Sequence, residues 1–138
     1  MNLKHCNLYL CLKVKSFSRL TSPRYLNIIS SNRQLSVLHT RIRNNCSDLQ
    51  LELFNNHVSD NAFCSCGHCI ESAEHYFFRC SHYTLHRHTL FNSLRPFPSS
   101  QCKLTTFGCT EYDYETNCKI FLSVHTYTKD TKRFDKNR

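Results

Sequence analysis

The sequence predicts a mainly α protein, a small helical domain with a zinc-binding knuckle between helices and few or no strands. Three observations lead to this prediction. The chain has 138 residues, 40% of them hydrophobic, which suits one domain with a modest core. Apolar residues recur at helical spacing in several segments. Residues 63–80 gather cysteines and histidines, the side chains that bind soft metal ions.

The first predicted helix covers residues 32–43. Leu35, Leu38 and Ile42 fall at positions i, i+3 and i+7, which places them on one face. Asn32 precedes them and is a suitable N-cap, because its side chain can accept a hydrogen bond from a free backbone N–H of the first turn. We expect the apolar stripe to be the buried face of this helix.

A second helix is predicted over residues 48–56. Ser47 can cap it, and Gln50 lies three residues later, where it would complete a capping box. The expected buried face consists of Leu49, Leu53 and Phe54.

Three further helices complete the predicted domain. A short one is capped by Ser72 and runs to residue 79, a longer one covers residues 81–94, and the last begins at residue 114 or 115 and runs to about residue 129 or beyond. The predicted buried side chains are Tyr76, Phe77 and Phe78 in the first, Tyr83, Leu90 and Leu94 in the second, and Cys118, Phe121, Leu122 and His125 in the third.

These elements divide the chain into three parts. Residues 1–21 are poorly specified, since their alternating apolar pattern has no partner strand nearby. Residues 22–128 form the helical zinc-binding domain. Residues 129–138 form a basic C-terminal tail, which we expect to fray.

The metal-ligand cluster allows two four-ligand sets. Cys64-x-Cys66-x8-His75-x4-Cys80 supplies three sulfurs and one ring nitrogen, as a closed structural zinc site requires. Cys66-x2-Cys69-x5-His75-x4-Cys80 is an alternative, one residue longer in the middle than the retroviral-type knuckle. Four of the ten cysteines fall in this stretch, which favours a metal site over buried free thiols.

The cysteines also bear on the cellular compartment. The N-terminal residues lack the long apolar run and small-residue cleavage site of a secretory signal. We therefore expect a reducing, intracellular setting, without distinguishing nucleus from cytoplasm. The alternative, a secreted disulfide protein, predicts no free thiols. The sequence contains no apolar run of about 18 residues, so no membrane partner is expected.

Catalytic patterns are missing from the sequence. Two glycines cannot form a phosphate-binding loop, and no pair among the ten carboxylates is placed for acid–base work. Glu71 or Glu74 could act on a metal-bound water, but a catalytic zinc needs an open coordination position, and three thiolates make zinc a poor Lewis acid. We therefore predict that the chain is not an enzyme and has no small-molecule substrate.

Several motifs resemble one family. They are the runs 33–43 and 46–49, Cys64-Ser65-Cys66-Gly67, Glu71, the run Glu74-His75-Tyr76-Phe77-Phe78-Arg79-Cys80, Tyr83, Arg87, Phe107-Gly108 and residues 127–134. Together they look like the C-terminal zinc-binding region of reverse transcriptases encoded by non-LTR retrotransposons. The resemblance covers about residues 22–134.

This resemblance implies a ligand set and a context. The ligands would be Cys64, Cys66, His75 and Cys80, with Cys69 as a spare thiol, and the ion would be Zn²⁺. The region would help to hold template RNA or target DNA beside a polymerase domain. The chain has neither that domain nor its Tyr/Phe-Ala-Asp-Asp motif, so it resembles a fragment without polymerase activity of its own.

Charge favours a nucleic-acid partner. The formal net charge is +8, and aromatic residues lie near arginines in and after the cluster. RNA or DNA is therefore the expected partner. The alternative is a non-functional or purely structural fragment that packs against a polymerase domain supplied elsewhere, which an exposed Leu35/Leu38/Ile42 stripe would favour. The candidate contacts are Arg41, Arg43, Arg79 and Arg87.

Overall fold

The computed structural model describes residues 32–96 and 114–135. The predictions for residues 1–21, Phe107-Gly108 and the last three residues lie outside these ranges. In order, the elements are α3 (Arg33–Arg43), α4 (Gln50–Asn55), a π-helical turn η3 (His75–Arg79), a 3₁₀ turn η4 (Ser81–Tyr83), α5 (Thr84–Leu94) and α7 (Tyr114–Asp130). The described residues form no strand, only an isolated bridge between Phe63 and Ile70. The prediction of a mainly helical domain is confirmed.

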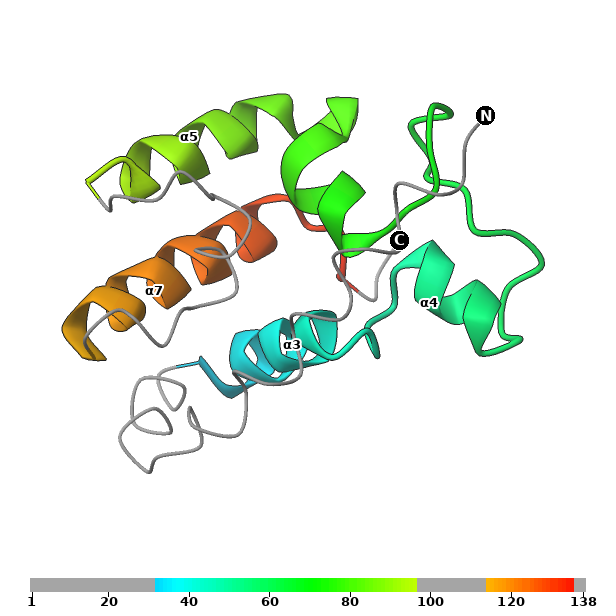
Figure 1. Cartoon of the computed structure of the whole chain (residues 1–138), viewed down its shortest axis with the longest axis horizontal. Coiled ribbons are helices and arrows are strands. Elements are labelled where there is room, and N and C mark those ends of the chain that lie inside the picture. Colours follow the sequence, from blue (N-terminus) through cyan, green and yellow to red (C-terminus); the bar gives the residue numbers. More distant parts are fainter. Residues whose placement is uncertain (1–31, 97–113, 136–138) are drawn as a thin grey trace.

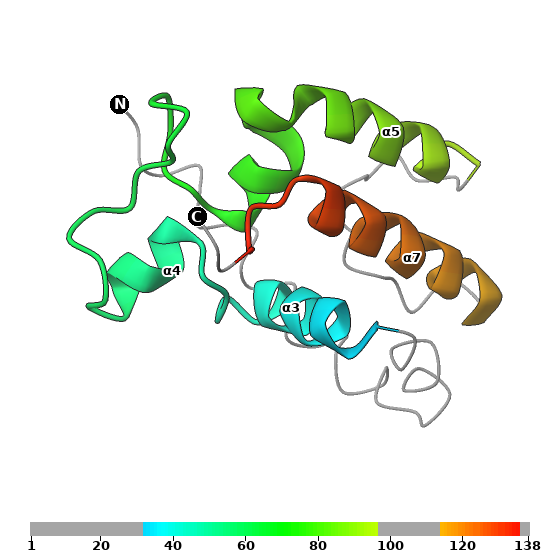
Figure 2. The same ribbon diagram turned by 180° about the vertical axis from the view of Figure 1, so that it is seen from behind.

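The long helix α7 lies in the middle of the fold. It packs against α5 on one side and α3 on the other, while η3 and η4 pack against α5 (Figure 1). Its inward residues Ile120, Val124 and Tyr127 are at most 2% exposed. Figure 2 shows the same order from behind, with α4 and the loop after it extending beyond the ends of the three long helices. No helix in the described part of the chain is both long enough and apolar enough to cross a membrane.

The first helix, α3, has a buried face that differs from the predicted stripe. Ile42 is fully buried as expected, but Ser36 and His39 are buried too, and Leu35 and Leu38 are only half-buried. The Asn32 cap is confirmed, since its Oδ1 accepts a hydrogen bond from Leu35 N at 3.2 Å. The buried face is rotated because His39 contacts His125 on α7. Hydrophobic periodicity cannot predict such a polar contact.

The second helix is shorter than predicted, and its capping partner was predicted wrongly. The helix begins at Gln50, and the carboxylate of Glu52, not the Gln50 amide, accepts hydrogen bonds from the backbone N–H and hydroxyl of Ser47. Gln50 Oε1 instead accepts from the Ser59 hydroxyl at 3.0 Å. Phe54, expected in the core, is 45% exposed because Glu52 takes the inward position on this short helix.

The later helices follow the predictions more closely. The core includes Tyr76, Phe77, Tyr83, Leu90, Leu94 and Phe121, as expected, whereas Leu122 is 50% exposed. The expected fraying of the tail is not seen within residues 129–135: α7 ends at Asp130, as the predicted helix allowed, and Thr131 is buried with its hydroxyl 2.7 Å from that of Tyr76. The Phe134 ring also packs 5.5 Å from the Tyr76 ring.

Candidate metal centre

Four side chains converge in the region between α4 and α5. The Sγ atoms of Cys64, Cys66 and Cys80 and a ring nitrogen of His75 all lie within 4.8 Å of one another. Cys64 Sγ is 3.7 Å from Cys80 Sγ, and Cys66 Sγ is 3.3 Å from His75 Nε2. A tetrahedral ion with metal–sulfur bonds of about 2.3 Å would place two sulfurs about 3.8 Å apart and a sulfur and a nitrogen about 3.6 Å apart. The four residues are therefore close enough to hold a metal ion.

The first two cysteines lie on a tight knuckle. Gly67 N donates to Cys64 O at 3.0 Å and closes the turn, while Gly67 itself has φ of +78°, a conformation that favours glycine. Cys64 N donates to Cys69 O at 2.9 Å, which ties the two sides of the loop together. The turn thus holds both thiols on the side that faces η3.

The other two ligands lie at the ends of the π-helical turn, since His75 begins it and Cys80 directly follows it. In an α-helix, residues five apart lie about 140° apart around the axis. The π-helical turn is wider, and a hydrogen bond from Cys80 N to His75 O, at 2.8 Å, closes it. The two residues are therefore one full turn apart, and both side chains face the knuckle. Ser72 Oγ accepts from His75 N at 3.1 Å and anchors the start of the turn.

Backbone amides act on the three thiols in a repeated pattern. The N–H group two residues later acts to lower the pKa of each thiol: Cys66 for Cys64, His68 for Cys66 and His82 for Cys80. Such donors stabilise the thiolate form that binds metals. The pattern is what a thiolate centre needs, because dipoles of the chain itself offset part of its negative charge.

Burial opposes ionisation in the absence of a metal. It raises the pKa of Cys64 to about 12 and also raises the pKa of Cys80. Burial also acts to raise the pKa of Cys66, but hydrogen bonds from the backbone and from the neighbouring thiols outweigh this effect, so the pKa of Cys66 is lowered. Burial lowers the pKa of His75, which favours the neutral imidazole that a metal requires.

The spare ligands lie apart from the centre. Cys69 is exposed and its sulfur does not belong to the converging group, so the geometry favours Cys64 over Cys69. His82 is exposed, with Nδ1 3.5 Å from Ser65 Oγ. His75 Nδ1 is buried and has no hydrogen-bond partner among the described residues, whereas metal-bound histidines usually donate through their second nitrogen.

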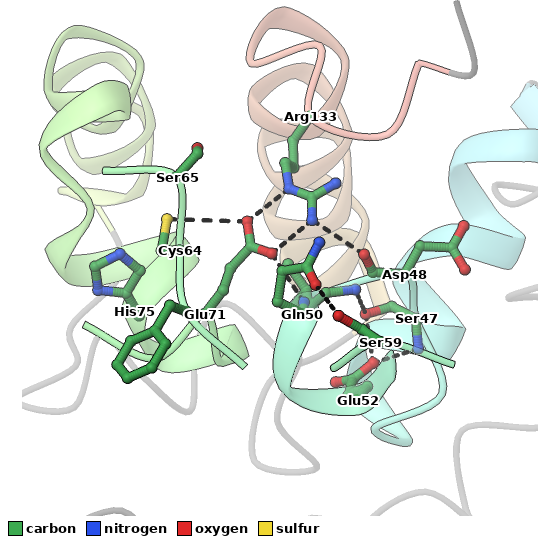
Figure 3. A network of polar contacts seen from close by, with 12 residues as sticks. Ser47, Asp48, Gln50, Glu52, Ser59, Cys64, Ser65, Glu71, His75 and Arg133 are labelled. Atoms are coloured by element: carbon green, nitrogen blue, oxygen red, sulfur yellow. Dashed lines mark hydrogen bonds and ion pairs between the residues drawn. The ribbon is translucent and has the colours of Figure 1, made fainter. Parts of the chain in front are cut away.

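A polar network beside the centre was not predicted. Glu71 is 2% exposed, and its carboxylate accepts from Arg133 Nε at 2.6 Å and Arg133 Nη2 at 2.5 Å (Figure 3). Glu71 Oε1 also lies 4.0 Å from Cys64 Sγ. The two charged residues are 62 positions apart, so no spacing rule could have paired them. Glu71, considered above as an acid–base group, thus takes part in a buried ion pair.

The four arginines predicted to contact nucleic acid lie in different settings. Arg79 is exposed and pairs with Glu74 at 2.9 Å. Arg87 is half-buried and donates to the carbonyls of Phe77 and Cys80, so it holds the end of the π turn. Arg41 is exposed and lines a groove of about 690 Å³ between α3 and the segment after α7, and Arg43 is the last residue of α3.

Comparison with known proteins does not identify a family. No family model, no curated protein and no solved structure matches the chain. The resemblance to the C-terminal region of retrotransposon reverse transcriptases therefore stays a prediction from the motif residues.

Proposed function

We propose that this chain is a zinc-stabilised module that binds RNA or DNA and has no polymerase activity of its own. The observation that carries the proposal is the closed set of Cys64, Cys66, His75 and Cys80, whose ligand atoms lie within 4.8 Å of one another. The motif resemblance to the C-terminal region of non-LTR retrotransposon reverse transcriptases supports the nucleic-acid role.

The donor chemistry supports zinc as the ion. Three sulfurs and one imidazole suit a soft or borderline ion, whereas magnesium and calcium prefer oxygen ligands. Four protein ligands would fill a tetrahedron and leave no position for a reacting water. The ion would therefore hold the fold together.

The charge of the chain supports a polyanionic partner. The net charge is +8, and eight of the 18 lysines and arginines lie outside residues 32–96 and 114–135. Binding tests therefore require the full chain. Among the predicted contacts, Arg41 and Arg79 are exposed and suit phosphate, whereas Arg87 would act through the metal-bearing turn that it holds.

Metal analysis of purified variants tests the centre. We expect one zinc per chain, lost in Cys64→Ser and His75→Ala and kept in Cys69→Ser, which serves as the matched control. Zinc retained in Cys64→Ser and lost in Cys69→Ser would instead assign the ligand set that contains Cys69. A wild-type chain that takes up no zinc would overturn the proposal.

Binding to labelled RNA and DNA over a salt series tests the nucleic-acid role. We expect affinity to fall with salt, since each neutralised phosphate releases counterions. Replacing both Arg41 and Arg79 with glutamine would reduce the slope of log K against log salt by about 2. Absence of binding at low salt, or binding that salt does not change, would contradict this role.

The interaction-fragment alternative gains no support from α3. Ile42, the last residue of the stripe that would have met a missing partner, is 0% exposed, Leu35 and Leu38 are half-buried, and the helix packs against α7.

A further inference from the structure

Glu71 connects the candidate metal centre to α4. Its Oε2 accepts from Gln50 N at 2.8 Å, and its backbone O accepts from Leu51 N at 3.3 Å. These are the first two amides of α4, and the N-cap residue Leu49 has no side-chain acceptor to offer them. A residue from the knuckle segment therefore caps the helix from a distance.

The same carboxylate lies against the sulfurs. Glu71 Oε1 is 4.0 Å from Cys64 Sγ, and Glu71 is 2% exposed. A divalent ion with three thiolates and a neutral histidine carries a net charge of −1. A buried carboxylate beside this group is repelled by it, and water screens the repulsion only weakly at such a depth.

Arg133 supplies the compensating charge. Its guanidinium bonds both carboxylate oxygens, and Nη2 also donates to Asp48 O at 3.0 Å. Figure 3 shows Arg133 reaching from the segment after α7 to a point between the knuckle and α4. This segment is anchored next to η3, because Thr131 Oγ1 lies 2.7 Å from Tyr76 Oη.

We infer that Arg133 is a positioning residue of the metal centre, acting through Glu71 so that metal binding and docking of residues 131–135 stabilise each other. The inference rests on the proposed zinc site. It predicts that the segment after α7 increases metal affinity although it contributes no ligand.

Zinc affinity of the full chain tests the inference, measured by competition with a chromogenic chelator. Arg133→Gln should weaken binding about 10- to 100-fold, the range found for residues that support metal ligands. Lys129→Gln is the matched control, because it removes the same charge from an exposed site on α7, and its affinity should stay within about threefold of wild type.

A double variant separates electrostatic positioning from simple loss of contacts. In Glu71→Gln/Arg133→Gln the uncompensated carboxylate is gone, so most of the lost affinity should return. A purely structural role of Arg133 would give no such recovery. The Co²⁺-loaded forms should show the same pattern in their thiolate-to-metal absorption, and circular dichroism checks that each variant is folded.

Two outcomes would overturn the inference: Arg133→Gln binding zinc within threefold of wild type, or a double variant binding no more tightly than Arg133→Gln. Failure of the wild-type chain to bind zinc would instead overturn the proposed function, so the two failures are distinguishable. Arg133→Lys, which keeps the charge but cannot bond both oxygens in the same way, should fall between wild type and Arg133→Gln.

Discussion

Two buried imidazoles join α3 to α7. His39 Nδ1 lies 3.3 Å from His125 Nε2, and both residues are at most 6% exposed. The His39 ring also meets Phe121 edge-on at 5.1 Å. Burial lowers the pKa of His125, because the charged imidazolium loses its hydration in the interior.

This histidine pair makes stability depend on pH. The unfolded chain protonates His125 near its ordinary pKa of about 6.5, whereas the folded chain protonates it only at lower pH. The unfolded state thus binds more protons below pH 6.5, and stability is lost as the pH falls from there towards the folded pKa. Between pH 7.5 and 5.5 the loss from this residue should reach up to about 1.4 kcal/mol.

A comparison with His125→Gln tests this prediction. Glutamine can keep a hydrogen bond to His39 but does not titrate. Urea unfolding at pH 7.5 and 5.5, at equal zinc concentration, should show a smaller loss for the variant, since any effect on the metal centre is common to both proteins. Equal losses in the two proteins would contradict the assignment to His125.

At the scale of elements, α4 depends on partners outside its own residues. It has six residues, too few to be stable alone, and its first amides are satisfied by Glu71. The turn before it is held by Glu52, which is 4% exposed and accepts both the N–H and the hydroxyl of Ser47. Polar contacts therefore set the position of this helix as much as apolar burial does.

Replacement of Glu52 tests this dependence. Glu52→Ala should lower the free energy of unfolding by about 2 kcal/mol, because it leaves two buried donors on Ser47 unpaired. Gln50→Ala, at the position expected from the capping-box pattern, removes a single hydrogen bond to Ser59 and should cost less than about 1 kcal/mol. Urea unfolding measures both, and equal costs would contradict the observed capping arrangement.

At the scale of the whole molecule, the candidate metal centre joins parts that the helices alone would leave loosely connected. The knuckle supplies two ligands and the π turn supplies the other two. Behind them a cluster of aromatic rings includes Tyr76, Tyr83 and Tyr127, and the Tyr83 and Tyr127 ring centroids each lie 5.3 Å from that of Tyr76. Tyr127 Oη also donates to Tyr76 O at 2.6 Å, which ties α7 to the metal-bearing turn.

Removal of the proposed zinc ion should destabilise the entire fold. Free zinc at a thousand times its Kd contributes about 4 kcal/mol to stability, and a chelator removes that contribution. We expect a lower melting temperature and reduced helical circular dichroism after chelation, both restored by zinc but not by magnesium, which prefers oxygen ligands. A melting curve unaffected by the chelator would show that the four residues do not hold a structural ion.

Local patterns in the sequence predicted much of this protein. Helical periodicity located α3, α5 and α7, because the spacing of apolar residues in an amphipathic helix can be recognised from the sequence of that helix alone. The ligand spacing predicted Cys66, His75 and Cys80 in both candidate sets, since these residues lie close together in the chain, and the motif resemblance favoured Cys64 over Cys69 as the fourth ligand. In both cases the deciding interactions are local in the chain.

Tertiary structure decided the contacts between residues distant in the sequence. The Glu71–Arg133 pair spans 62 positions and the His39–His125 pair spans 86. Each is stabilised by burial that only the folded chain creates, so its partners cannot be found from spacing or propensity. For the same reason the sequence did not predict the buried face of α3, where His39 turns inward to meet His125 on α7. It also did not predict the packing of the segment after α7, which Thr131 and Arg133 anchor to Tyr76 and Glu71.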